Sequence, residues 1–269
     1  MLAFAGNSLL CRMALGGGAI DAASFTTIRF GSGALALLLL AAVSGAVRTS
    51  TRGGTWRSAA VLFVYAFPFA FAYTRLATGT GALVLFGTTQ ITMIAAGLRA
   101  GERPSTAEWI GLVIALSGLV WLVMPGLSTS PSPTGVALMF VAGIAWGAYS
   151  LLGRGSTAPV ADVTGTFLRL VPLLLATWAA VWPSTQLSIR GATLAVVSGA
   201  LTSAGGYVIW YYALGHLTAM RASILQLSVP AIAAVGGTLV LAEPVTVRLV
   251  TAAALILGGV ALSIGDRGQ

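Results

Sequence analysis

The chain has 269 residues, of which 57% are hydrophobic and only 7% are charged. A soluble domain carries roughly a quarter charged residues, so this composition excludes an ordinary water-soluble protein and indicates a chain surrounded mostly by lipid. The formal charge of +8 comes from arginines scattered along the chain rather than clustered on one face, which argues against a nucleic-acid partner. With one cysteine and one histidine, neither a disulfide framework nor a histidine-based metal site is expected, and no cofactor is implied.

Apolar stretches separated by polar, glycine and proline residues predict ten membrane-spanning helices, since a span needs about 20 apolar residues. In chain order they cover residues 1–15, 22–45, 56–76, 79–99, 105–125, 134–153, 161–182, 191–214, 217–241 and 244–265. The first is shorter than a full span and lacks the basic start of a signal peptide, so we expect a short first membrane helix, and the sequence leaves open whether that helix is complete at its N-terminus. The predicted fold class is therefore all-α, a polytopic membrane protein.

The two halves of the chain match when one is shifted by about 140 residues. Arg29 then aligns with Arg169, and Pro104 aligns with Pro244. A Ser-Leu-Leu-x-Arg sequence, in which the fourth residue varies, occurs near the start of each half with Cys or Gly at that position. A duplicated apolar unit is typical of secondary transporters, in which the substrate binds between the repeats.

A serine- and proline-rich linker, residues 128–133, separates two predicted units, residues 1–127 and 134–269. Each unit holds five helices, and because five is odd the second unit must cross the membrane in the opposite sense, as an inverted repeat. With both termini in the cytoplasm, the inner ends and the tail hold eight arginines: Arg48, Arg52, Arg57, Arg99, Arg103, Arg154, Arg221 and Arg267. The outer ends then hold four: Arg12, Arg75, Arg190 and Arg248. The positive-inside rule favours this orientation.

Six short motifs carry a resemblance to a known family. They are Gly6-Asn7-Ser8, Ser24-Phe25-Thr26-Thr27-Ile28-Arg29, Gly101-Glu102-Arg103-Pro104, Ala145-Trp146-Gly147-Ala148-Tyr149, Thr166-Phe167-Leu168-Arg169 and Ala242-Glu243-Pro244. With them the chain resembles the drug/metabolite transporter superfamily, and within it the ten-helix EamA type, over nearly its whole length. The resemblance implies export of amino acids, other metabolites or drugs from bacterial cells, with the YddG-type aromatic amino-acid exporters as a candidate close relation. The first helix departs from the family pattern, since it is short and lacks the usual Trp before Gly6.

Polar and aromatic side chains near the predicted midplane are the candidates for substrate binding. They are Asn7, Ser8, Tyr65, Thr88, Gln90, Trp146, Tyr149, Tyr207, Trp210, Gln226 and Ser228. An amide buried in lipid must find a hydrogen-bond partner, which directs Gln90 and Gln226 inward, either to a cavity or to a neighbouring helix. The aromatic residues either line a cavity or belong to the interfacial belt. We expect a central cavity lined by the first, third, fourth, sixth, eighth and ninth predicted helices.

Two prolines and two arginines fall inside predicted helices. Pro68 and Pro230 each free a backbone carbonyl and act either as a hinge for alternating access or as a static bend. Arg29 and Arg169 lie seven or eight residues into their helices. One reading is structural, with side chains that reach toward the headgroups or donate to backbone carbonyls, and the other is gating or capture of a substrate carboxylate.

All six carboxylates fall in predicted loops or at helix ends: Asp21, Glu102, Glu108, Asp162, Glu243 and Asp266. Proton coupling usually uses a buried acid, so uniport or exchange is favoured over proton antiport. We expect Glu102 with Pro104, and Glu243 with Pro244, to begin helices, because proline and an acidic residue both suit a first helical turn.

No catalytic or nucleotide-binding motif is present, so a transporter is predicted rather than an enzyme. The favoured substrates are small zwitterionic or amphipathic metabolites, amino acids foremost, carried across the bacterial inner membrane, and the sequence leaves the oligomeric state open, a monomer included. Three alternatives remain open: a drug or cation exporter, which needs a buried acid; a phosphate-ester exchanger, which needs paired basic residues; and a membrane-embedded enzyme.

Overall fold

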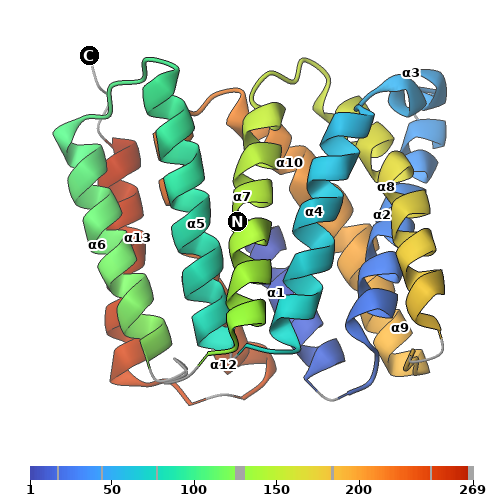
Figure 1. The fold of residues 1–269 in the computed structure, drawn as a ribbon. Coiled ribbons are helices and arrows are strands. Elements are labelled where there is room, and N and C mark those ends of the chain that lie inside the picture. The colour runs from blue at the N-terminus through green and yellow to red at the C-terminus, as the bar shows by residue number, and fades with distance from the viewer. Residues whose placement is uncertain are drawn as a thin grey trace.

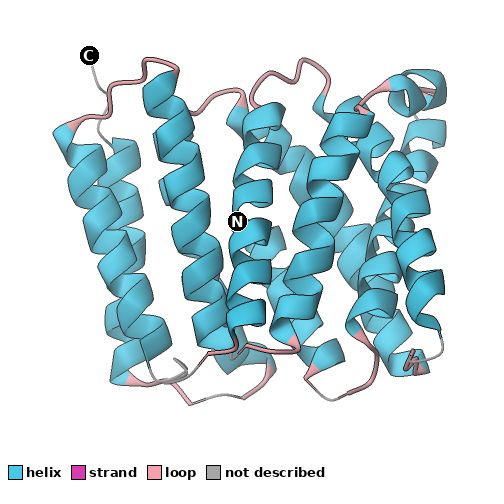
Figure 2. Cartoon of the chain, viewed as in Figure 1, coloured by secondary structure: helices cyan, strands magenta, loops and turns pink. Residues whose placement is uncertain are grey.

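In a computed structural model the chain forms a bundle of helices that lie side by side and are joined by short loops at two opposite ends (Figures 1 and 2). The structure describes residues 1–16, 18–43, 45–76, 78–124, 131–182, 185–242 and 244–265. Within these ranges the only β pairing is an isolated bridge between Ile20 and Leu187. Half of the predicted linker, residues 128–130, lies outside the described residues.

The first half contributes α1 (Leu2–Leu15), α2 (Ala22–Val43), α3 (Val47–Arg52), α4 (Trp56–Tyr73), α5 (Thr78–Arg99) and α6 (Thr106–Val123). The second half contributes α7 (Pro133–Gly153), α8 (Pro159–Val181), α9 (Ile189–Val197), the π-helical segment η3 (Ser198–Ser203), α10 (Ala204–Leu214), α11 (Ala219–Gln226), α12 (Ser228–Val240) and α13 (Val247–Gly265). Nine helical units of the described chain are long and apolar enough to cross a membrane, with Ile189–Leu214 and Ala219–Val240 each counted as one, and α1 is a shorter apolar helix. The all-α class of a polytopic membrane protein is confirmed.

Helix starts follow local capping chemistry. The Thr55 and Ser105 side chains each accept the backbone N–H three residues on, and Ser58 and Glu108 bond back, which completes a capping box before α4 and α6. The expectation that Glu102 and Pro104 lie in a first turn is therefore wrong, because Ser105 is the N-cap and the helix begins after it.

The expected start at Pro244 is also wrong, because α13 begins three residues later, at Val247. Glu243 and Asp266 lie outside the described residues.

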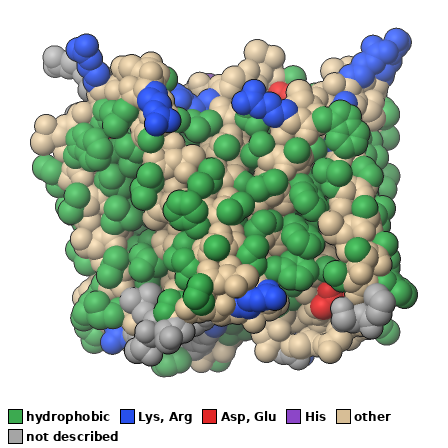
Figure 3. Space-filling view, viewed as in Figure 1, with side chains coloured by type: hydrophobic (Ala, Val, Ile, Leu, Met, Phe, Trp, Pro, Cys, Tyr) green, Lys and Arg blue, Asp and Glu red, His purple; other side chains and the backbone are tan. Residues whose placement is uncertain are grey.

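The lateral surface of the bundle is apolar. Figure 3 shows hydrophobic side chains over the middle of the visible face and arginines along its upper and lower edges. Large side chains such as Leu39, Ile209 and Leu239 are well exposed. A soluble monomer rarely exposes so much contiguous apolar area, whereas lipid tails cover it without penalty. The surface is that of a membrane-embedded protein.

Close helix crossings depend on glycine. A Cβ on Gly259 of α13 would lie 2.5 Å from the Gly111 carbonyl oxygen of α6, and one on Gly111 would lie 2.5 Å from the Gly259 carbonyl oxygen. Small residues of this kind let backbones approach within a bilayer, where no hydrophobic force drives helices together.

Two aspartates make matching contacts between the halves at opposite ends of the bundle. Asp21, just before α2, accepts the backbone N–H of Gln186 at 2.9 Å through Oδ2. Asp162, in the first turn of α8, accepts the backbone N–H of Gly54 at 3.0 Å through Oδ1. The helices α2 and α8 run in opposite directions (Figure 1). The two aspartates are related by the same shift of about 140 residues, so their contacts match the pattern of the inverted repeat, which stays a prediction.

Candidate functional site

A cavity of about 650 Å³ lies at the end of the bundle that holds the α1–α2 loop, the lower end in Figure 1. We call this the cavity end, and the opposite end, which holds α3, the closed end. The cavity wall comes mainly from Asn7, Ser8 and Cys11 of α1 and from Phe69 and Tyr73 of α4. Its volume falls within the 300–1,000 Å³ range of typical small-molecule sites.

Loop residues complete the wall of this cavity. They include Ile20 and Asp21 of the α1–α2 loop, Gln186 before α9, and Leu241 after α12. Of the six predicted lining helices, α1 and α4 line the cavity, and the ninth contributes through Leu241. The predicted fourth, sixth and eighth helices, which are α5, α7 and α9–α10, do not line it, and the candidate residues they carry contact neighbouring helices instead.

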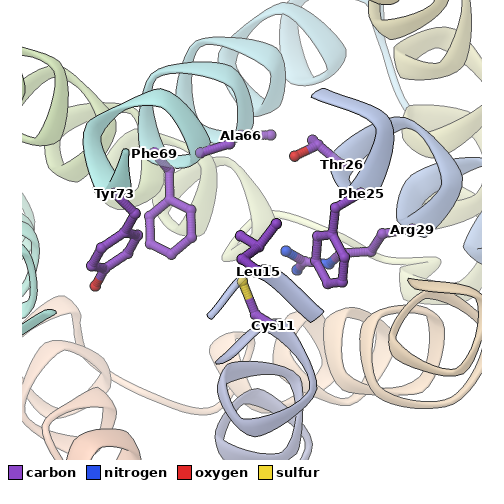
Figure 4. A pocket seen from close by; sticks show the side chains of 9 residues that line it. Cys11, Leu15, Phe25, Thr26, Arg29, Ala66, Phe69 and Tyr73 are labelled. Carbon is purple, nitrogen blue, oxygen red and sulfur yellow. The ribbon is translucent and has the colours of Figure 1, made fainter. Parts of the chain in front are cut away.

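A small hollow adjoins the cavity deeper in the bundle and has a volume of about 10 Å³, enough for about one water molecule. It shares Cys11, Leu15, Phe69, Ala70 and Tyr73 with the larger cavity. Its remaining lining residues are Phe25, Thr26, Arg29 and Ala66. Figure 4 shows the Arg29 side chain extending from α2 toward the side chains of α1 and α4. A buried cation thus borders the inner limit of a space whose wall, besides its apolar residues, also includes the charged side chains of Arg12 and Asp21.

Arg29 is held by hydroxyl groups of the second half. Its Nε donates to Ser203 Oγ at 2.7 Å and its Nη2 to the Tyr207 hydroxyl at 3.5 Å. The guanidinium carbon lies 4.8 Å from the centroid of the Phe30 ring, a cation–π contact. Arg29 is only 5% exposed and does not reach the surface.

Arg169 has different partners. Its Nη1 donates to the carbonyl oxygens of Gly53 and Gly165, each at 2.8 Å. Gly53 follows α3 at the closed end, so this arginine ties α8 to the α3–α4 loop. Donation to backbone carbonyls is the structural role that the sequence analysis gave as one alternative for this arginine.

The two candidate residues of α1 that line the cavity are linked to the backbone and to η3. Asn7 Oδ1 accepts a hydrogen bond from Ser198 Oγ at 2.6 Å, and Ser8 Oγ donates to the Phe4 carbonyl at 3.0 Å. Ser198 is the first residue of η3, and π-helical segments occur frequently at functional sites. The cavity wall is therefore joined directly to an irregular turn of the second half.

An aromatic cluster fills the bundle on the closed-end side of Asn7. Its members come from six helices and are buried except for the partly buried Phe4: Phe4, Phe30, Tyr65, Trp146, Tyr149, Phe167, Tyr207, Trp210 and Tyr211. The Trp146 ring contacts four others, with centroids 4.9–5.9 Å apart: those of Phe4, Tyr65, Tyr149 and Tyr207. Aromatic pairs in edge-to-face and offset geometry add to the stability that apolar burial provides. In this conformation the cluster separates the cavity from the closed end.

Polar groups join the aromatic cluster to neighbouring helices. Trp146 Nε1 donates to Gln226 Oε1, and Trp210 Nε1 donates to Ser150 Oγ at 3.1 Å. Gln90 Nε2 donates to the Ser223 carbonyl at 2.6 Å. The amides of Gln90 and Gln226 thus point inward and bond between helices.

The remaining candidates have local roles in this conformation. Thr88 packs against Gly143, where a Cβ would lie 2.7 Å from the Thr88 Cβ. Ser228 Oγ donates to the Leu225 carbonyl at 2.7 Å. Tyr65, Tyr149 and Tyr207 belong to the aromatic cluster. Of the predicted substrate-binding residues, Asn7 and Ser8 line the cavity, and substrate binding by the others stays a prediction.

The prolines interrupt helices in two ways. Pro68 lies within continuous α4 and leaves the Val64 carbonyl without an intrahelical partner. The predicted helix 217–241 is instead divided at Leu227, and Pro230 lies in the first turn of α12. The proline ring conflicts with the carbonyl four residues earlier, that of Gln226, which is the last residue of α11.

Two ion pairs of the described residues lie at the closed end, where one joins the α5–α6 loop to the end of α7 and the other joins α6 to α11. Glu102 Oε1 lies 2.6 Å from Arg154 Nη2, and Glu102 also accepts the Ala219 N–H at the start of α11 at 2.9 Å. Glu108 Oε1 lies 2.8 Å from Arg221 Nε. An acid at a helix N-terminus is favoured by the helix dipole, so Glu102 stabilises α11 rather than its own helix. These contacts hold the α5–α6 loop against α7 and α11.

Sequence reasoning did not single out Cys11 or Phe69. Both follow a predicted candidate by four residues, Asn7 and Tyr65 respectively, and therefore lie on the same helix face. That spacing is the signal that would have found them.

Comparisons with known proteins agree with this architecture. Residues 133–265 match the model of the EamA-like transporter family. The chain is 48% identical to the uncharacterized protein PA1977 of Pseudomonas aeruginosa over 99% of this chain and 92% of that one. It is 27% identical to an uncharacterized transporter of Archaeoglobus fulgidus over 71% of this chain and 70% of that one.

A crystal structure of a protein with 19% sequence identity superposes with a TM-score of 0.82, covering 98% of this chain and 96% of the other, and thus shares the fold. The nine candidate spans and the shorter α1 of the described chain, the cavity and these relatives lead to one conclusion. The chain belongs to the EamA-like transporter family of the drug/metabolite transporter superfamily and is a membrane transporter.

Proposed function

We propose that this transporter exports small amphipathic metabolites, amino acids foremost and aromatic or other neutral ones among them, by alternating access. It works in the bacterial inner membrane with both termini in the cytoplasm. In this orientation the cavity end faces outward and the closed end faces the cytoplasm. The observation that carries the proposal is the cavity of about 650 Å³ at one end combined with a packed aromatic cluster toward the other. A transporter that is open to one side and sealed to the other has this form.

The cavity chemistry favours a substrate with both polar and apolar parts. Asn7 and Ser8 supply an amide and a hydroxyl, while Phe69 and Tyr73 supply rings. Pockets that bind small metabolites combine an apolar wall with a few polar groups that fix orientation. A neutral amino acid with an apolar side chain presents this combination.

Uniport or exchange is proposed rather than proton antiport. The carboxylate of Asp21 lies at the cavity wall, but it already accepts the backbone N–H groups of Ser24 and Gln186, each at 2.9 Å. Glu108, which is buried, is paired with Arg221 at the closed end. Neither acid is placed to carry a proton through the middle of the bundle.

Purified protein in liposomes tests the proposal. We expect vesicles loaded with phenylalanine, leucine or alanine to release at least one of them faster than protein-free vesicles, without an imposed pH gradient. Asn7→Ala is expected to slow this release about five-fold, the effect of roughly one lost hydrogen bond. The control is Ser117→Ala, because Ser117 is exposed on the lipid-facing side of α6. Vesicles that release no amino acid, or that release it only with a proton gradient, would contradict the proposal.

A further inference from the structure

We infer that Arg29 binds the carboxylate of the substrate at the inner limit of the cavity. This assignment rests on the proposed transport of amino acids and deepens it, because it names the group that recognises the anionic end. Three observations carry it: the donors that Arg29 leaves unused, the absence of an acidic partner, and the contrast with Arg169.

The first observation is the hydrogen-bonding of the guanidinium. An arginine carries five N–H donors in a planar fork. Within the described residues, Arg29 makes two hydrogen bonds, one from Nε to Ser203 and one from Nη2 to Tyr207. Both N–H groups of Nη1 and one of Nη2 have no protein acceptor there, and Arg29 borders the hollow that adjoins the cavity (Figure 4). A carboxylate accepts two parallel N–H bonds from such a fork.

The second observation concerns charge. Among the described residues, the ion pairs of the chain join Arg154 to Glu102 and Arg221 to Glu108, and no acid lies in ion-pair contact with Arg29. A cation removed from water is costly unless an anion or enough acceptors replace its hydration. The two hydroxyls and the Phe30 ring meet only part of this need. A bound anion supplies the rest.

The third observation is the difference between two arginines at matching positions. Arg169 donates to the carbonyl oxygens of Gly53 and Gly165, so backbone acceptors satisfy it at the closed end. The hydrogen-bond acceptors of Arg29 are instead two side-chain hydroxyls, and Arg29 lies on the side of the cavity end. A purely structural role would be expected to use the same kind of partner in both halves. Arg29, on the side of the cavity end, instead has N–H donors available for a ligand.

The surroundings of Arg29 indicate which carboxylate fits. Phe25, Phe69 and Tyr73 line the same hollow, and Cys11 borders both the hollow and the cavity. Rings beside a guanidinium suit an acid whose carboxylate lies close to an apolar or aromatic group. A strongly hydrated anion such as inorganic phosphate matches this wall poorly.

Alkylation of Cys11 gives a direct test, because it is the one cysteine of the chain and it is not oxidised to a disulfide. Purified protein is treated with a maleimide in the presence of L-phenylalanine, L-phenylalaninamide, 3-phenylpropionate or inorganic phosphate. We expect the two carboxylates to slow alkylation at about ten-fold lower concentration than the amide, which lacks the anionic group, because charge-assisted bonds are about twice as strong as neutral ones. Phosphate is expected to protect weakly.

Variants of Arg29 localise the effect. Arg29→Met is expected to abolish the preference for acid over amide, and Arg29→Lys, which keeps the charge but not the fork, to retain part of it. Arg169→Met is the matched control and is expected to leave the preference unchanged. If Arg29→Met does not fold, the comparison of acid with amide on the unmodified protein still decides the matter. Equal protection by acid and amide, stronger protection by phosphate, or an unchanged preference in a folded Arg29→Met protein would overturn the inference.

The outcomes separate this inference from the proposed function. If liposomes release amino acids but acid and amide protect Cys11 equally, the role of Arg29 is wrong and the transport proposal stands. If no amino acid is released but 3-phenylpropionate protects in an Arg29-dependent way, the carboxylate site stands and the substrate proposal is wrong.

Discussion

Asp21 is a single side chain that connects the two halves of the transporter. Its Oδ1 accepts the N–H of Ser24 and caps α2, while its Oδ2 accepts the N–H of Gln186 from the loop before α9. Burial raises the pKa of this carboxyl, but the hydrogen bonds from Ser24 and Gln186 outweigh that effect and hold the pKa below its ordinary value. The ionised form is therefore the one that stabilises the fold.

Asp21→Asn is expected to lower the melting temperature in detergent at pH 7, because one amide oxygen cannot replace two carboxylate oxygens as acceptors. A group with a lowered native pKa stabilises fully above its unfolded pKa, about 3.9 for Asp, and loses this effect as the pH falls through the lowered value. The difference in melting temperature between the parent and the variant should therefore shrink below about pH 4. A difference that stays constant from pH 7 to the acid limit would show that the carboxylate charge has no part in it.

For single residues, the sequence predicted which side chains matter better than it predicted their hydrogen-bond partners. The shared offset marked Arg29 and Arg169 as equivalent, yet Ser203 lies 174 residues from Arg29 and Gly53 lies 116 residues from Arg169. Contacts over such separations depend on how whole helices pack, which local patterns do not contain. Asn7 was a prediction from polarity alone, and its bond to Ser198 follows from the position of η3.

Among the elements, η3 combines a backbone irregularity with contacts to the site. Ser198 at its start bonds to Asn7, and Ser203 at its end accepts from Arg29. Gly199 lies between them, where a Cβ would fall 1.9 Å from the Arg29 carbonyl oxygen and 2.1 Å from Ser32 Oγ. The close approach of η3 to α2 therefore requires glycine at this position.

Gly199→Ala is expected to destabilise the protein by about 1–3 kcal/mol, because the new methyl group meets backbone that cannot move aside. Its matched control is Gly205→Ala, one helical segment later, where a Cβ would have nothing within 4 Å. That control should be neutral or stabilising by about 0.5–1 kcal/mol, since glycine weakens a helix relative to alanine. Thermal unfolding of both variants in detergent measures the difference, and equal melting temperatures would refute the packing argument.

Helix positions were predictable because the apolar stretches are long and punctuated, and each of the ten predicted helices corresponds to a helical segment of the described chain. The short α3 and the π-helical segment were not predicted, since neither has a distinctive local pattern. The role of Glu102 was misjudged for another reason. The Glu102 carboxylate accepts a backbone N–H at the N-terminus of α11, a helix that is distant in sequence.

For the molecule as a whole, packed and open volume are distributed unequally between the two ends of the bundle. The aromatic cluster and the ion pairs of Glu102 and Glu108 lie on the closed-end side of the cavity. The cavity occupies the other end. The sequence predicted the ten helices and a shared cavity, but it did not predict which end opens, because that depends on a small balance between two packings of the same helices.

The account depends most directly on the cavity being open to the outside of the cell, and the sidedness of Cys11 tests this. Right-side-out and inside-out membrane vesicles are treated with a membrane-impermeant thiol reagent, and the rate of Cys11 modification is compared between them. We expect modification to be several-fold faster in right-side-out vesicles, because Cys11 borders the cavity and the aromatic cluster blocks access from the other face. Equal rates in both preparations, or faster modification in inside-out vesicles, would contradict an outward-facing cavity.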